Sequence, residues 1–137
     1  MSTTINPLTG LLDVASGVFS ALGEAVTNLE LALEADVSAR RTAREAKDAY
    51  QDSESEFAAE ALFAANGKNA EQRKAEVDVA LVKARTSGPL AYRWQQMNAA
   101  RNDADNAAMT LEQCSKRFRA TEAAADLTAA MLKAASR

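Results

Sequence analysis

The residues of this chain that can act as nucleophiles, bases or metal ligands include no histidine and one cysteine, Cys114. Without histidine the chain cannot build a Ser-His-Asp triad, a Cys-His dyad or a histidine-containing zinc site. One cysteine also excludes an intrachain disulfide and a cysteine-based metal site. Cys114 has small neighbours at helical spacing, so we expect a small buried side chain, with a reactive thiol as the lesser alternative.

The carboxylates offer no clear catalytic constellation. Glu71 and Glu76 have the chemistry for acid–base work, but no partner group or pocket-forming pattern accompanies them. Helical proteins build di-metal sites from Glu-x-x-His pairs, which a chain without histidine lacks. We therefore predict a non-enzymatic protein with no catalytic residue, no cofactor and no metal.

Basic residues form two clusters, although the net charge of the chain is −3. Their members are Arg40, Arg41, Arg44 and Lys47 in one, and Lys116, Arg117 and Arg119 in the other. In the helix alignment described below, both clusters fall at the same level and form a basic band. Such a band suits phosphate groups or an acidic protein surface. The plainer alternative is a solvated face, partly neutralised by Glu45 and Glu112.

The elements that position these residues are all predicted to be helices. The chain is rich in alanine, the best helix former, and has only two prolines and five glycines. We expect a helix after Pro7 that kinks or breaks near Gly23, then helices over 24–65, 70–85 and 89–135. Asn66-Gly67 should end the long helix, because glycine is able to take the left-handed conformation. Asn69 should cap the short helix, with Gln72 reaching back.

Apolar residues recur every seven positions in both long helices, which is typical of coiled-coil packing. One column is Leu22, Leu29, Asp36, Ala43, Tyr50, Phe57 and Ala64, and the other is Leu90, Met97, Ala104, Leu111, Phe118, Ala125 and Leu132. Laid antiparallel, the columns pair Ala64 with Leu90, Tyr50 with Ala104 and Leu22 with Leu132. Asp36 then meets Phe118, so either the aspartate rotates outward or the alignment is wrong by a heptad. The predicted fold is an all-α, coiled-coil-like antiparallel hairpin with a short connecting helix and an N-terminal helical extension.

That alignment leaves the N-terminal apolar stripe beyond the hairpin, with nothing beside it. The stripe consists of Leu8, Leu11, Leu12, Val18, Phe19 and Leu22. An uncovered apolar stripe usually marks an interface, so we predict a homo-oligomer formed through residues 1–23, with 24–137 as the hairpin domain. Folding back on the hairpin is the alternative. No stretch reads as a secretory signal or membrane span, and the first basic residue is Arg40, so no membrane contact is expected.

Three aromatic residues, Phe63, Tyr92 and Trp94, fall where the short helix meets the long ones. Aromatic side chains at a junction of three helices usually fill the core, which is what we expect here. An exposed binding hot spot is the alternative.

The run from Tyr50 to Val77 resembles small helical bacteriophage and prophage proteins in which an alanine- and glutamate-rich helix ends in Gly-Lys-Asn-Ala-Glu-x-Arg. The matching residues are Gly67, Lys68, Asn69, Ala70, Glu71 and Arg73. The resemblance covers roughly residues 45–135 and is mostly helix-cap chemistry. It implies a phage source and a setting in the cytoplasm of the bacterial host, often near recombination functions, and it supplies no catalytic residues.

Three functions follow from these observations. The first is an oligomeric interaction protein that binds a host or phage macromolecule, for example to inhibit a host or defence protein. The second is a DNA-recombination accessory that binds nucleic acid through the basic band. The third is a structural or scaffolding part of the virion.

Overall fold

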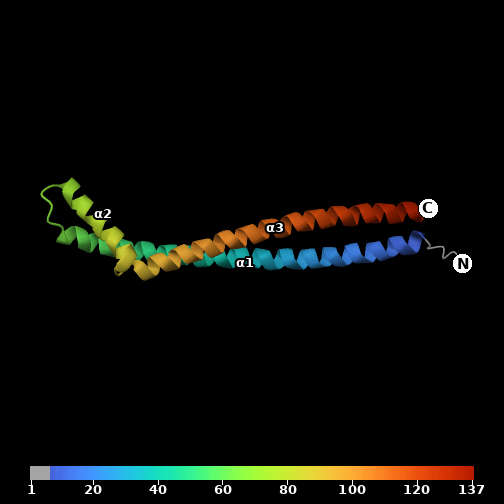
Figure 1. Cartoon of the computed structure of the whole chain (residues 1–137), viewed down its shortest axis with the longest axis horizontal. Coiled ribbons are helices and arrows are strands. Elements are labelled where there is room, and N and C mark those ends of the chain that lie inside the picture. Colours follow the sequence, from blue (N-terminus) through green and yellow to red (C-terminus); the bar gives the residue numbers. More distant parts are fainter. Residues whose placement is uncertain (1–6) are drawn as a thin grey trace. The chain divides into compact units, whose positions relative to one another are not determined.

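A computed structural model describes residues 7–137, which form three helices and no strand. Helix α1 spans Pro7–Ala64, α2 spans Ala70–Ser87 and α3 spans Ala91–Ala135 (Figure 1). The all-α fold is therefore confirmed, and packing of α1 against α3 makes a helical hairpin. The first six residues, where the predicted N-terminal segment begins, lie outside the described part of the chain.

Helix α1 runs without interruption through Gly10, Gly17 and Gly23, so the break expected near Gly23 is wrong. A glycine inside a helix costs about 1 kcal/mol relative to alanine, but it leaves the backbone hydrogen bonds in place. The long apolar seam described below offsets that cost. None of these glycines has a positive φ.

The connection between α1 and α2 is held by side-chain caps. The Asn69 side chain accepts a 2.8 Å hydrogen bond from the Gln72 amide, and the Gln72 side chain accepts one of 2.9 Å from the Lys68 amide. The predicted N-cap at Asn69 is thus confirmed. The Gln72 side chain reaches back to the amide of Lys68, one residue before the cap. Helix α1 ends just before Asn66-Gly67, as predicted, but Gly67 does not use the left-handed conformation, because no described glycine has a positive φ.

The chain divides into two compact units. Unit 1 combines Met1–Asp36 with Ala107–Arg137, and unit 2 is Val37–Asn106. Each unit therefore contains a part of α1 and a part of α3, and unit 2 also contains α2. The two sequence-predicted domains, 1–23 and 24–137, stay a prediction.

In unit 1, α1 and α3 pack along a seam whose residues alternate at spacings of three and four. All of its members are buried or half-buried: Leu11, Ala15, Val18, Leu22, Ala25, Leu29, Ala32 and Asp36 from α1, and Ala107, Leu111, Cys114, Phe118, Thr121, Ala125, Thr128 and Leu132 from α3. The fully buried members are mostly alanine. Alanine buries little apolar area, so this seam is long but thin.

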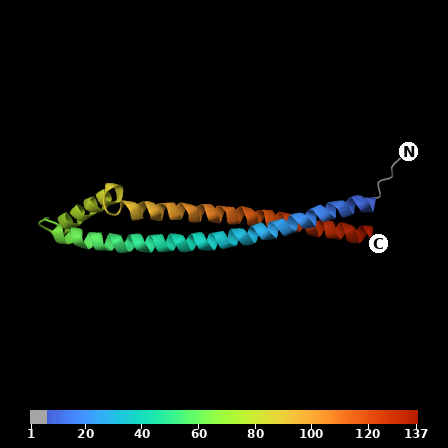
Figure 2. The same ribbon diagram turned by 90° about the horizontal axis from the view of Figure 1, so that it is seen from below.

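In unit 2, α2 turns back and lies beside the end of α1 (Figures 1 and 2). The core there is a cluster of Tyr50, Ala84, Leu90 and Met97, with Phe57, Leu81 and Trp94 packed against it. All three helices contribute to this cluster. It contains the largest buried side chains named for the core, including a tyrosine and a methionine.

The predicted pairing of α1 with α3 is wrong, although both seven-residue columns do lie largely on the seam. Tyr50 contacts Trp94, ten residues before the predicted Ala104. In unit 1, Asn28 lines a depression with Cys114, whereas Leu29 was expected opposite Ala125. The reason is that α2 lies beside the end of α1, in the place where α3 was predicted to lie (Figures 1 and 2). Helix α3 therefore begins level with residues near Tyr50.

Two further expectations change with the alignment. Residues 7–22 do not extend past the hairpin, because they belong to unit 1 together with the C-terminal part of α3. Asp36 is only 4% exposed, so it does not rotate outward; the alignment was at fault.

Candidate interaction surfaces

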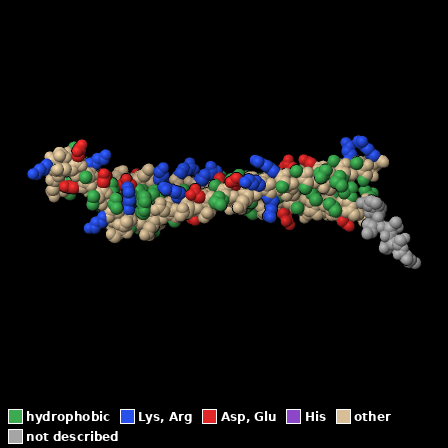
Figure 3. Space-filling view, turned by 45° about the horizontal axis from the view of Figure 1, so that its top comes forward, with side chains coloured by type: hydrophobic (Ala, Val, Ile, Leu, Met, Phe, Trp, Pro, Cys, Tyr) green, Lys and Arg blue, Asp and Glu red, His purple; other side chains and the backbone are tan. Residues whose placement is uncertain are grey.

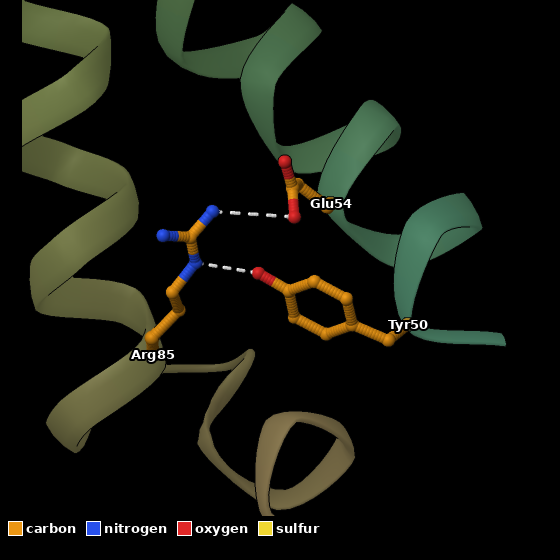
Figure 4. A network of polar contacts seen from close by, with 3 residues as sticks. All are labelled: Tyr50, Glu54 and Arg85. Atoms are coloured by element: carbon orange, nitrogen blue, oxygen red, sulfur yellow. Dashed lines mark hydrogen bonds and ion pairs between the residues drawn. The ribbon is translucent and has the colours of Figure 1, made fainter. Parts of the chain in front are cut away.

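A polar and aromatic network in unit 2 joins the three helices, and Figure 4 shows its polar contacts between α1 and α2. Arg85 Nε of α2 donates a 2.5 Å hydrogen bond to the Tyr50 hydroxyl of α1, and a terminal nitrogen of Arg85 lies 3.3 Å from a Glu54 carboxylate oxygen. Trp94 of α3 completes the group. Its ring centroid lies 5.0 Å from the Arg85 guanidinium carbon and 5.1 Å from the Tyr50 ring centroid. The network fixes α2 against both long helices.

The protonation of this network suits structure and not proton transfer. Burial raises the pKa of Tyr50 above its ordinary value of 10.0, a hydrogen bond to Glu54 acts in the same direction, and Arg85 opposes them. The pKa of Arg85 is raised chiefly by its hydrogen bond to Tyr50. At neutral pH the phenol is neutral and the guanidinium is charged. A general acid or base works best with a pKa near the operating pH, which neither group has.

The carboxylates singled out from the sequence stabilise helix ends. A Glu76 carboxylate oxygen accepts a 2.9 Å hydrogen bond from the Asn66 amide. Glu71 lies in the first turn of α2, where the helix dipole favours a negative charge. Over residues 7–137, no group of three His, Cys, Asp or Glu side chains is placed to hold a metal ion.

The Gly-Lys-Asn-Ala-Glu-x-Arg motif of residues 67–73 also stabilises a helix end. Besides the Asn69 cap, Arg73 donates a 3.5 Å hydrogen bond to the Gly67 carbonyl, which ties α2 to the preceding loop. Residues 67–73 therefore carry cap chemistry at the turn between α1 and α2.

The predicted basic band draws on both units. Arg40, Arg41, Arg44 and Lys47 belong to unit 2, whereas Lys116, Arg117 and Arg119 belong to unit 1. The band was predicted from the incorrect alignment, and it stays a prediction. Lys116 pairs with Glu112 along the same helix at 3.1 Å, and both side chains are about two-thirds exposed or more. An exposed pair of this kind contributes little stability.

Within unit 2, a basic residue of α3 lies beside α1 at Ala49, two residues after Lys47. Arg93 of α3 donates a 3.5 Å hydrogen bond to the Ala49 carbonyl, which places its guanidinium beside α1. Only the correct alignment of α1 with α3 could have identified this neighbour, because the two residues are far apart in the sequence.

The predicted oligomer interface divides into two groups. Leu11, Val18 and Leu22 are half-buried in the seam with α3, which corrects their assignment to an intermolecular surface. Leu8, Leu12 and Phe19 are exposed. They belong to a larger set of exposed apolar residues in unit 1: Leu8, Leu12, Val14, Phe19, Val26, Leu31, Leu33, Met109, Leu127 and Met131. Figure 3 shows apolar side chains gathered over the part of the molecule next to the grey residues.

A groove opens between the end of α1 and the start of α2 in unit 2. It has a volume of about 600 Å³ and is lined by Ala58, Ala59, Leu62, Ala70, Arg73, Lys74 and Val77. Nearby on α1, Phe63 is 96% exposed, and Tyr92 at the start of α3 is 69% exposed. The expectation that both of these aromatic side chains fill the core is therefore wrong. It holds only for Trp94, which packs against the core cluster.

The N-terminal part of α1 is long and apolar enough to cross a membrane, judged by length and composition alone. The expectation that no stretch of the chain approaches a membrane span is therefore corrected. The same test is passed by core helices of soluble proteins and by signal sequences, so it does not assign a membrane role.

Compared with known proteins, the chain matches no family model, no curated protein and no solved structure. The resemblance to phage proteins therefore stays a prediction.

Proposed function

We propose that this chain is a non-enzymatic helical interaction protein that oligomerises and binds a further macromolecule. The observation that carries the proposal is the surface of unit 1. Ten large apolar side chains are exposed there, while the seam between the two helices buries mostly alanine.

Exposed apolar residues are normal when scattered singly, but a gathered set of this size usually marks an interface. A pair of helices has no third layer to cover a second apolar side, so additional helices from another chain complete such a unit. Coiled-coil-like packing between chains is the arrangement that the seven-residue columns favour.

The resemblance to phage proteins supports a setting in the cytoplasm of a bacterial host, with a host or phage protein as the further partner. The apolar groove between α1 and α2 and the exposed Phe63 give unit 2 a surface of its own for such a partner. Oligomerisation through unit 1 and partner binding through unit 2 then use different parts of the chain.

Sedimentation of the full chain over a range of concentrations tests the oligomerisation. One chain has a mass of 14.6 kDa, and we expect at least twice that mass at tens of micromolar. A mass of one chain throughout that range would contradict the proposal.

Nucleic-acid binding is a second candidate function, favoured by the contribution of Arg93 to the basic residues of α1 in unit 2. Contacts to phosphate release counterions, so binding of this kind weakens steeply as salt rises. A fluorescence-anisotropy titration with single- and double-stranded DNA, at 50 and 200 mM salt, measures this. Absence of binding at the lower salt would eliminate this candidate.

A further inference from the structure

The oligomerisation proposed above has a specific face, and this inference depends on that proposal. In unit 1, the seam between α1 and α3 separates two faces of the helix pair. Asn28 of α1 and Arg117 of α3 line the same depression, together with Ala25, Gln113 and Cys114. Asn28 and Arg117 therefore mark one of the two faces.

The other face of α1 carries a regular apolar column. Each member follows a seam residue directly and is 38–52% exposed, and the members recur every seven residues: Leu12, Phe19, Val26 and Leu33. We call this column the flank stripe. Val26 is two positions before Asn28, so it lies on the opposite side of the seam from Asn28.

The flank stripe gives α1 three apolar positions in every seven, counting the two that form the seam. Two in seven is sufficient for a helix that packs against a single partner. Three in seven is the pattern of a helix in the core of a bundle, with neighbours on two sides. In unit 1, α3 supplies only one of these neighbours.

The matching flank of α3 carries mostly small residues. The positions that follow its seam residues at the same seven-residue spacing are Ala108, Ser115, Glu122 and Ala129. Ser115 is two positions before Arg117, so this column lies on the same face as Val26. One face of unit 1 thus presents a column of large residues on α1 beside a column of small residues on α3.

We propose that this face docks against the same face of a second copy, with the flank stripe of each copy packed on the small column of the other copy's α3. A two-fold axis parallel to the helices produces this arrangement, because it places each α1 over the partner's α3. Large residues then meet small ones, as interdigitation at constant spacing requires. The exception is Glu122, whose carboxylate must turn to the solvent at the edge.

Charge favours the same pairing. Helix α1 has five acidic and no basic residues between Pro7 and Asp36, whereas residues 107–137 have five basic and three acidic ones. Packing α1 against the partner's α3 brings opposite net charges together. Packing α1 against the partner's α1 places two wholly acidic segments side by side, which weakens association.

The face is large enough for a stable dimer. The part of α1 in unit 1 has 30 residues from Pro7 to Asp36, which is about 45 Å at 1.5 Å per residue. Two helices side by side are about 20 Å wide, so the face measures roughly 900 Å². A standard-size interface buries about 800 Å² on each partner.

The opposite face is a poorer interface. Its exposed apolar residues include Val14 on α1 and Leu127 and Met131 on α3, but Asn28 interrupts the α1 column and Arg117 lies at the same level on α3. Burying an arginine and an asparagine without partners costs free energy that the flank stripe avoids.

The test compares two valines of the same helix, both exposed in the single chain. Val26→Asp places a carboxylate in the flank stripe, and Val14→Asp, the matched control, places one on the opposite face. Sedimentation equilibrium of the full chain measures the dimer dissociation constant, with circular dichroism to verify helix content. We expect Val26→Asp to weaken the dimer at least about 100-fold, because two buried carboxylates face apolar groups. Val14→Asp should change it less than about threefold.

A crosslinking experiment tests the pairing without a destabilising charge. In a Cys114→Ala background, one chain carries Val26→Cys and a coexpressed chain of different tag length carries Ser115→Cys. The control pair carries Val14→Cys and Met131→Cys on the opposite face, at matched levels, because they lie 14 residues from Asn28 and Arg117 respectively. Disulfides require Cα atoms within about 7 Å, so we expect a mixed dimer for the first pair only.

The outcomes separate this inference from the proposed function. A wild-type monomer overturns both. A wild-type oligomer that Val26→Asp leaves intact, or that crosslinks through the control pair, overturns the assignment of the face and keeps the oligomerisation. Recovery of the wild-type chain in the membrane fraction, with no dimer in detergent-free solution, means that the apolar part of α1 enters lipid, which also overturns the inference.

Discussion

Removing the Tyr50 side chain tests whether the three-helix cluster of unit 2 depends on this residue. Tyr50 is 3% exposed, contacts the Trp94 ring and accepts the Arg85 hydrogen bond. Replacing a buried aromatic residue by alanine costs about 3–5 kcal/mol, because the apolar contacts are lost and a cavity is left. Tyr50→Phe keeps the ring and removes only the hydroxyl, for which we expect about 1 kcal/mol.

Trp94 is the only tryptophan of the chain and packs against Tyr50, so its fluorescence reports this cluster directly. Urea unfolding followed by that signal gives the free energy of unfolding. For a slope of about 2 kcal/mol/M, a loss of 4 kcal/mol lowers the midpoint by about 2 M. Tyr92→Ala is the control, because Tyr92 is exposed; we expect a change within about 0.5 kcal/mol.

Two results would refute this reasoning. If Tyr50→Ala cost less than about 1 kcal/mol, the cluster would not be held by packing of the ring. If Tyr50→Phe and Tyr50→Ala cost the same, the contribution would come from the hydroxyl and Arg85 and not from the aromatic contact.

Three other predictions can be tested by urea unfolding: one on alkaline pH, one on two glycines and one on a helix cap. The pKa of Tyr50 is raised in the folded state, so its contribution to stability is fully present below pH 10 and is lost as pH rises through the folded-state pKa. Tyr50→Phe should lack that alkaline loss of stability. An equal alkaline decline in both proteins would show that another group causes it. Gly17→Ala should stabilise the chain by about 0.5–1 kcal/mol, since nothing lies within 4 Å of the added Cβ. Gly88→Ala should destabilise the chain by about 1–3 kcal/mol, because the added Cβ would lie 2.6 Å from the Ala84 Cα. Equal effects of Gly17→Ala and Gly88→Ala would contradict this account. Asn69→Ala should lower the free energy of unfolding by about 1 kcal/mol through loss of the α2 cap, and Asn69→Gly by about a few tenths of a kcal/mol. If Asn69→Gly cost more than Asn69→Ala, the loss of the side-chain cap would not explain the effect.

The positions of the helices followed from local chemistry and could be predicted. The Asn69 cap, the turn before Pro89 and the alanine-rich stretches between them depend on neighbours within a few residues. Where a prediction failed locally, as at Gly23, a glycine was interpreted as a kink or break in the helix. A glycine permits these conformations without requiring them.

Predicting the candidate surfaces required the tertiary structure more than predicting the positions of the helices did. The sequence identified Leu12 and Phe19 as interface residues, and they are exposed, but it placed Leu11, Val18 and Leu22 with them. Whether a residue beside the seam is covered depends on what lies at its level in the other helix. The groove beside Leu62 and the Arg93 contact with Ala49 could not be predicted without knowing which residues of another helix lie at the same level.

The amino-acid sequence by itself determined that the chain is helical, where α2 starts, and which columns of α1 and α3 turn toward each other. Only the tertiary structure decided how far the two columns are shifted along one another. The physical reason is that apolar residues recur every three and four positions in both helices, so several alignments bury the same side chains. The return of α2 along the end of α1, fixed by Arg85 between Tyr50 and Trp94, selects one of these alignments.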